Sequence, residues 1–205
     1  MRHSGIWRNP SIFVLLAGLL LGGSAYAADT YTLDADHSTI TFRVRHLISK
    51  VSGSFGAFEA EIVGDQGSPE KGSVQFTIDV ASIDTGNEKR DEHLRNEDFF
   101  DAEKYPAITF KSTKIVRRAE NAFDVHGTFT MRGVTRDIVV PVVFNGVMDD
   151  PWGNTKAGFE ISMTLNRKDY GVSWNKLMDK GGMILGDEVE IFISLQAVQV
   201  KEEKK

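Results

Sequence analysis

Cysteine is absent from this chain of 205 residues. Without a thiol the chain cannot form a disulfide, use a cysteine nucleophile or bind a metal through a thiolate. Its stability must therefore come from a packed apolar core. Proline is also scarce, with 5 residues, whereas 13 phenylalanines supply much of the material for such a core.

A second long apolar run is missing as well. The one such run, residues 12–21, follows Arg2 and Arg8 and precedes Ala25-Tyr26-Ala27, a small-residue pattern typical of a cleavage site. This order predicts a cleaved secretory signal peptide over residues 1–27 and hence export to the periplasm. An uncleaved membrane anchor is the alternative. The rest of the chain is expected not to span a membrane.

An excess of basic residues is also lacking, since the chain has 24 Lys and Arg against 29 Asp and Glu. The formal net charge at pH 7 is −5, and the predicted signal peptide contributes arginine but no acidic residue. This balance argues against nucleic acid and against anionic membrane surfaces as partners. We expect one domain over residues 28–200 and a charged, disordered tail over residues 201–205.

Alternation of apolar and polar residues runs through most of the remaining chain and is typical of strands with one buried face. It predicts about eight or nine strands. The connections are short and rich in Gly, Asp, Asn and Pro, so neighbouring strands should be antiparallel. The alternating segments are residues 31–33, 39–44, 58–62, 73–80, 108–110, 123–129, 138–144, 157–165 and 189–195.

This alternating pattern predicts an all-β domain, either a sandwich or a closed barrel. A barrel of eight strands can hold one small ligand. The large apolar side chains could fill such an interior or line a cavity in it, and periodicity leaves both open. Gly53 and Gly56 are expected to mark a bend or a bulge.

One charged segment, residues 88–100, departs from the strand pattern. It contains good helix formers and no β-branched residue, and Asn87 is a suitable N-cap. We predict a short exposed helix and a turn, with Phe99 and Phe100 anchoring the segment on the sheet. Tyr105-Pro106 should return the chain to an extended path.

Catalytic and metal-binding patterns are lacking. The histidines do not show the H-E-x-x-H spacing, and the polar clusters at residues 34–37 and 91–93 are interpreted as turn caps rather than metal ligands. There is no G-x-S-x-G sequence, and Gly181-Gly182 does not fit a phosphate-binding loop. We therefore expect no catalytic residue, no bound metal and no cofactor.

Four segments in order carry a resemblance to a known family: DADHSTITFRVRHL, SIDTGNEKRDEHLRNEDFFDAEKYPAITFKST, GTFTMRGVTRDIVVPVVF and NRKDYGVSW. Together they resemble the YceI-like family of exported proteins, over residues 30–200. The resemblance implies a lipocalin-like antiparallel eight-stranded β-barrel, with one short helical connection near residues 88–100. It also implies a long apolar pocket that binds polyisoprenoid or a similar lipid.

The expected function is non-catalytic binding, with transport or storage, of a long-chain apolar lipid such as a polyisoprenoid, an isoprenoid quinone or a fatty-acid-like molecule. An enzyme acting on a lipid and an interaction protein with a packed, ligand-free barrel are the rival interpretations. A homodimer is left open. The candidate ligand-binding residues are Phe42, Val44, Phe76, Ile78, Phe99, Phe100, Phe110, Phe129, Phe159, Ile161 and Trp174.

Two of these assignments carry alternatives. Trp174 either plugs one end of the barrel as part of the core or lines the mouth of the pocket. Arg90, Arg95 and Arg167 could pair with an anionic head group such as a diphosphate, because guanidinium groups match its geometry. The alternative is that each arginine pairs with neighbouring carboxylates.

Overall fold

The structure is a computed structural model of the chain, and it describes residues 28–64, 67–177 and 183–201. The predicted signal peptide and residues 202–205 of the predicted tail lie outside the described residues. Within the described part, eleven strands form one sheet. The strands are β1 (Asp29–Leu33), β2 (Thr39–His46), β3 (Ser49–Phe55), β4 (Phe58–Gly64), β5 (Ser73–Asp79), β6 (Ile83–Asp84), β7 (Ala107–Arg117), β8 (Ala122–Met131), β9 (Val134–Asp149), β10 (Thr155–Asn166) and β11 (Leu185–Gln199).

Eight of these strands close into a barrel, in the order β1-β4-β5-β7-β8-β9-β10-β11, because β11 also pairs with β1. All of the pairings are antiparallel. The predicted eight-stranded antiparallel barrel is thus confirmed. Closure of this kind gives each of these eight strands a partner on both sides.

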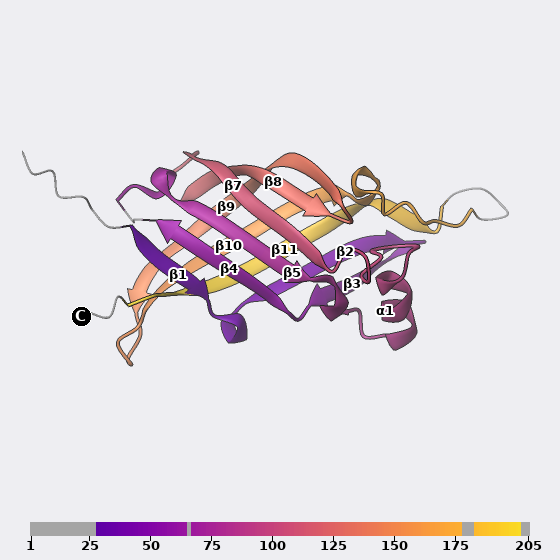
Figure 1. The fold of residues 1–205 in the computed structure, drawn as a ribbon, viewed down its shortest axis with the longest axis horizontal. Coiled ribbons are helices and arrows are strands. Elements are labelled where there is room, and N and C mark those ends of the chain that lie inside the picture. Colours follow the sequence, from indigo (N-terminus) through magenta and orange to yellow (C-terminus); the bar gives the residue numbers. More distant parts are fainter. Residues whose placement is uncertain (1–27, 65–66, 178–182, 202–205) are drawn as a thin grey trace, which may run out of the picture.

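The long strand β11 has two partners along one edge. Its last residues pair with β1, whereas residues 185–194 pair with β2. Strands β3 and β6 extend the sheet beyond β2. Figure 1 shows the barrel lengthwise, with α1 (Glu88–Arg95) and the β2–β3 hairpin at one end. We call this the α1 end, and we call the opposite end, which holds β1 and the β9–β10 turn, the β1 end.

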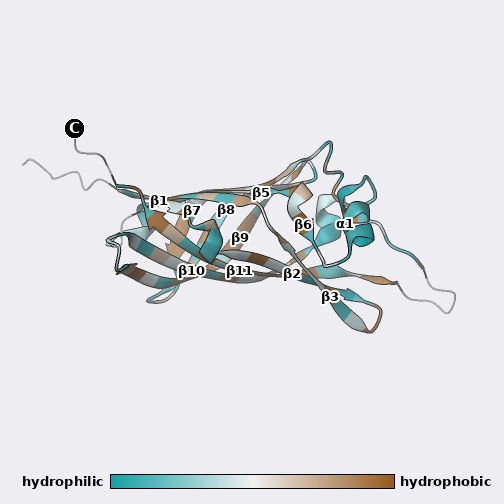
Figure 2. Cartoon of the chain, turned by 90° about the horizontal axis from the view of Figure 1, so that it is seen from below, coloured by the Kyte–Doolittle hydropathy of each residue, from teal (hydrophilic) through white to brown (hydrophobic). Residues whose placement is uncertain are grey.

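The charged segment is a helical connection, as predicted. The Asn87 side chain accepts a hydrogen bond from the Arg90 amide at 3.1 Å and so caps α1. A turn follows, and it buries Phe99 and half-buries Phe100 against the core at the α1 end. In Figure 2 the ribbon of α1 is mostly hydrophilic, whereas the strands alternate between hydrophilic and hydrophobic residues. The segment therefore covers one end of the barrel with an apolar inner side and a charged outer side.

Four single-turn 3-10 helices complete the described secondary structure, and each stands at a strand end. They are η1 (Ala35–His37), η2 (Pro69–Lys71), η3 (Val80–Ser82) and η4 (Arg167–Tyr170). Among them η4 matters most for the interior, because it carries the buried residues Arg167 and Tyr170.

The bend or bulge predicted for Gly53 and Gly56 is a bend at Gly56, whereas no bulge occurs at Gly53. Pairing between β2 and β3 runs without a register shift from Ile40–Phe55 to His46–Ser49. A Cβ atom on Gly53 would lie 2.4 Å from the Phe42 ring. Gly53 is therefore needed to make room for an inward-facing ring, while Gly56 lies at the bend between β3 and β4.

Candidate functional site: an apolar cavity in the barrel

The interior of the barrel is hollow along much of its length. The larger cavity has a volume of about 220 Å³ and extends to the α1 end, where Leu94, Phe99 and Phe100 form part of its wall. Among the described residues, the polar members of its lining are Thr41, Thr109 and Arg167. Alternate residues of a strand share one face, so the apolar set of each strand turns inward together. Such a space offers dispersion contacts and almost no hydrogen bonds.

Nine of the residues predicted to bind ligand line this cavity, and two do not. Phe159 lines a second cavity instead, and Trp174 lines neither. Contact between any of them and a ligand stays a prediction. The residues that line the larger cavity are Phe42, Val44, Phe76, Ile78, Phe99, Phe100, Phe110, Phe129 and Ile161.

The second cavity, about 130 Å³ in volume, lies toward the β1 end, where Tyr31 and Ile62 form part of its wall. Phe159 contacts Phe144 there, with ring centroids 5.5 Å apart. The two cavities share four lining residues, which we call the neck: Val74, Val142, Ile161 and Leu195. The cavities therefore adjoin end to end at these apolar side chains.

Several lining residues were missed because the prediction favoured aromatic side chains. Ile138 and Val140 on β9, and Met163 and Leu165 on β10, line the larger cavity. Each belongs to an alternating set that the sequence already shows, so the period of two could have found them. Leu94 was the one strongly apolar residue of the helical segment, which was the available signal for its inward position.

Trp174 belongs to the packing at the α1 end. Its ring centroid lies 5.1 Å from that of Phe99 and 5.2 Å from that of His93. It is half-buried and packs against the core cluster that contains Tyr170 and Val172. Of the two alternatives for this residue, the geometry favours the plug.

Arg167 is buried at the edge of the larger cavity, with 4% of its surface exposed. Its guanidinium donates hydrogen bonds to the carbonyl oxygens of Gly186 at 2.8 Å, Val172 at 2.6 Å and Trp174 at 2.9 Å. A fourth contact joins it to the Asp187 carboxylate at 3.4 Å. Burial lowers the pKa of Arg167 from its ordinary value, and the nearby Asp187 charge opposes this shift.

Arg90 and Arg95 hold the helical segment in place and line neither cavity. Arg90 donates to the hydroxyl and the carbonyl oxygen of Thr85, at 2.7 and 2.8 Å. Arg95 donates to the carbonyl oxygens of Ala81 and Ile83, at 2.9 and 3.0 Å. The hydrogen bonds found for these two arginines thus go to carbonyl oxygens and to the Thr85 hydroxyl rather than to carboxylates.

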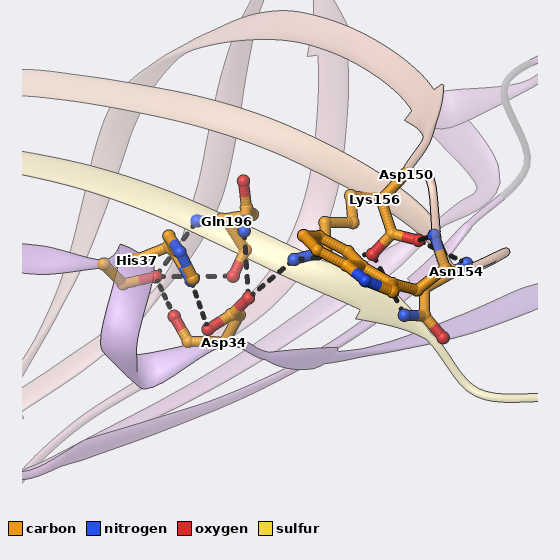
Figure 3. Close-up of polar contacts among 8 residues, drawn as sticks. Asp34, His37, Asp150, Asn154, Lys156 and Gln196 are labelled. Atoms are coloured by element: carbon orange, nitrogen blue, oxygen red, sulfur yellow. Dashed lines mark hydrogen bonds and ion pairs between the residues drawn. The ribbon is translucent and has the colours of Figure 1, made fainter.

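A polar network lies outside the cavities, around Asp34 (Figure 3). The Asp34 carboxylate accepts hydrogen bonds from His37 at 3.0 Å, Gln196 at 2.9 Å and Lys156 at 3.1 Å. These contacts, led by the one from His37, hold the pKa of Asp34 well below its usual range. The Ser38 hydroxyl donates to the Asp34 carbonyl oxygen at 2.7 Å rather than to the imidazole. The arrangement therefore does not resemble a nucleophile with its base.

His93, in the second polar cluster, contacts the Asp98 carboxylate at 2.9 Å. Across residues 28–64, 67–177 and 183–201, no group of three or more His, Asp or Glu side chains is close enough to hold a metal ion. The same residues include no helix that is long and apolar enough to cross a membrane.

The Asp34 network predicts a specific dependence of stability on pH. Because the pKa of Asp34 is lower in the folded protein than in the unfolded chain, its contribution is present above about pH 4 and is lost as the pH falls below that value. We expect Asp34→Asn to lower the free energy of unfolding at pH 7 and to matter less at pH 3. Urea denaturation at both pH values measures this, with Asp36→Asn, two residues away in η1, as the exposed control. An equal loss at pH 7 and pH 3 would contradict the prediction.

Comparison with known proteins places this chain among similar barrels. The model of the YceI-like domain family matches residues 31–197. A UPF0312 protein from Pseudomonas aeruginosa strain LESB58 is 38% identical over 193 residues, which is 90% of this chain and 97% of the relative. A UPF0312 protein from Ectopseudomonas mendocina is 34% identical over 195 residues, covering 94% of this chain and 98% of the relative.

Solved structures give the same picture. BcnA from Burkholderia cenocepacia is 29% identical, with a TM-score of 0.70 over 80% of this chain and 98% of that protein. A Campylobacter jejuni YCEI protein is 33% identical, with a TM-score of 0.65 over 77% of this chain and 90% of that protein. A polyisoprenoid binding domain from Saccharophagus degradans shares the fold at 16% identity, with a TM-score of 0.64 over 83% of this chain and 98% of that domain.

Proposed function

This chain belongs to the YceI-like family, and on that premise we propose that it binds one long apolar lipid chain, of the polyisoprenoid kind, inside its barrel. The binding is non-catalytic and serves transport or storage of the lipid. The observation that carries the proposal is the apolar lining of two cavities placed end to end. A polyisoprenoid binding domain with the same fold adds support.

The energy for such binding comes from burial of the chain. Each methylene transferred from water contributes about 0.8 kcal/mol, so a chain that fills both cavities needs few polar contacts. Arg167 directs its donors to carbonyl oxygens of the protein, and Arg90 and Arg95 line neither cavity. The proposal therefore assigns affinity mainly to the apolar chain, and it assigns any anionic head group a secondary part.

The two rival functions fit the interior less well. A packed interaction barrel would fill its interior with side chains, because protein cores are close-packed and contain few voids. An enzyme acting on a lipid needs a nucleophile or a metal close to the chain, whereas the wall here is built from alkyl and aryl groups with two threonines and one engaged arginine. The proposal also places the protein in the periplasm, after cleavage of the predicted signal peptide. Sequencing the N-terminus of the exported protein tests that part.

Phenylalanine-to-leucine substitutions test the binding proposal. Phe76→Leu should fold and should weaken the binding of apolar chains of every length about fourfold or more, because contact with roughly one methylene equivalent is lost. Phe159→Leu should weaken the binding only of chains that are long enough to reach the second cavity. Displacement of a fluorescent apolar probe by prenyl alcohols of defined length measures both effects.

The matched control is Gln75→Asn, since Gln75 adjoins Phe76 but is exposed on the outer face of β5. Its chain affinities should equal those of the parent. The binding proposal fails if the two leucine variants, shown to be folded, bind every chain as the parent does.

A further inference from the structure

Strands β9 and β10 pair along only part of their length. Their ladder runs from Asp149–Thr155 to Val142–Ile161 and then stops. Strand β9 begins earlier, at Val134, and β10 continues to Asn166. The structure thus leaves residues 134–141 of β9 and residues 162–166 of β10 without a ladder between them. We call this part of the wall the seam.

Proline at position 141 explains where the ladder stops. The amide of Phe144 donates to the carbonyl oxygen of Asn121 at 2.8 Å, on the β8 side of the strand. Successive amides of a strand point to opposite edges, so the nitrogen of Pro141 faces β10. A proline nitrogen carries no hydrogen and cannot donate. The last pair of the ladder is Val142–Ile161, so the ladder ends immediately before Pro141.

The seam opens directly onto the larger cavity. Ile138 and Val140 on β9, and Met163 and Leu165 on β10, line that cavity from the two sides of the seam. On the outer face Val139 is 46% exposed, which is unusual for a valine in the middle of a strand. A single layer of apolar side chains therefore lies between the cavity and solvent at this place.

The seam is bounded at the α1 end by polar contacts and a buried ring. Arg136 donates to the Asp169 carbonyl oxygen at 2.8 Å, and Arg132 donates to the Gly171 carbonyl oxygen at 2.6 Å. Tyr170 is buried and packs edge-on against Phe129, with ring centroids 5.2 Å apart. These contacts tie η4 to the start of β9, so the unpaired part of the wall is closed at the end of the barrel and at the Val142–Ile161 pair.

We propose that the seam is the passage through which the apolar chain enters and leaves the barrel. This inference rests on the proposed function. Separating two paired strands breaks ladder hydrogen bonds that an apolar chain lying between the strands cannot replace, and each such loss is costly. Parting the seam displaces only apolar side-chain contacts, and the arriving chain replaces them. The end that α1 covers is a poorer route, because Phe99, Tyr170 and Val172 are buried across it.

A disulfide across the seam tests the passage, and the absence of native cysteine makes any disulfide formed the engineered one. The pair Val139→Cys with Thr164→Cys joins two exposed positions on the two sides of the seam, each between residues that line the larger cavity. Where the strands stand too far apart for a disulfide, a short bis-maleimide closes the same pair. We expect closure to slow loading and release of a fluorescent apolar chain at least tenfold, with reduction of the disulfide restoring both rates.

The control pair, Val143→Cys with Glu160→Cys, bridges the same two strands where they are already paired. It should leave both rates unchanged. Pro141→Val supplies the missing amide and should also slow exchange. If the closed variant binds normally at equilibrium and its loading and release rates are unchanged, the proposal that the seam is the passage is wrong. Absence of binding in the parent protein would instead overturn the proposed function, so the two failures can be told apart.

Discussion

Replacement of Arg167 with methionine is expected to lower the free energy of unfolding by about 3 kcal/mol or more. The guanidinium is buried and satisfies the carbonyl oxygens of Gly186, Val172 and Trp174. Methionine keeps much of the apolar stem but donates nothing, so these acceptors lose their partner, at roughly 1–3 kcal/mol for each one that water cannot reach. Urea denaturation at pH 7 measures the loss.

Two further variants separate the causes of this effect. Lys168→Met removes a neighbouring cation that pairs with the same Asp187 carboxylate, at 2.9 Å, from an exposed position, and should cost less than about 1 kcal/mol. Arg167→Lys keeps the charge but cannot reach three separate carbonyl oxygens, so it should lie between the parent and Arg167→Met. A stability for Arg167→Met within about 1 kcal/mol of the parent would contradict the structural role of this arginine.

Ile161→Phe is expected to reduce the affinity for long apolar chains about 100-fold and to leave short chains unaffected. Ile161 is a neck residue, is 8% exposed and lines both cavities. A phenylalanine ring at this position would extend into the cavities and block the path between them. A chain stopped at the neck leaves its remaining methylenes in water. Loss of three or four buried methylenes, at about 0.8 kcal/mol each, corresponds to a change of about 100-fold.

Affinities of prenyl alcohols of increasing length give the comparison. In the parent, affinity should rise with length until both cavities are filled, whereas in Ile161→Phe it should level off earlier. Ile161→Leu conserves volume and serves as the control. An unchanged length profile in Ile161→Phe would show that the chain does not pass the neck.

Much of the cavity could be predicted from alternation along the strands. Phe42 and Val44, like Phe76 and Ile78, lie two residues apart and do face the same interior. Alternation could not decide between a sandwich and a barrel, because closure depends on which strands pair, and the pairing of β1 with β11 joins opposite ends of the chain. The prediction of a barrel rather than a sandwich came from the resemblance to the YceI-like family.

Features that depend on register were beyond the reach of the sequence pattern. The consequence of Pro141 follows only once the strand that faces its nitrogen is known. Similarly, a glycine inside a strand pattern suggests a bulge when only the sequence is known. In the structure Gly53 lies beside the Phe42 ring, where a side chain would not fit. Arg167 was considered as a partner for a lipid head group. The sequence does not show that three backbone carbonyl oxygens lie within hydrogen-bonding distance of its guanidinium.

Native mass spectrometry of the purified protein, before and after organic extraction, tests the central claim most directly. The account predicts a population carrying one apolar lipid per chain, loss of that mass on extraction, and its return when a polyprenyl chain is added back. A protein that carries no lipid as purified, and that takes up no added chain while folded, would contradict the proposal that the barrel is a lipid-binding site.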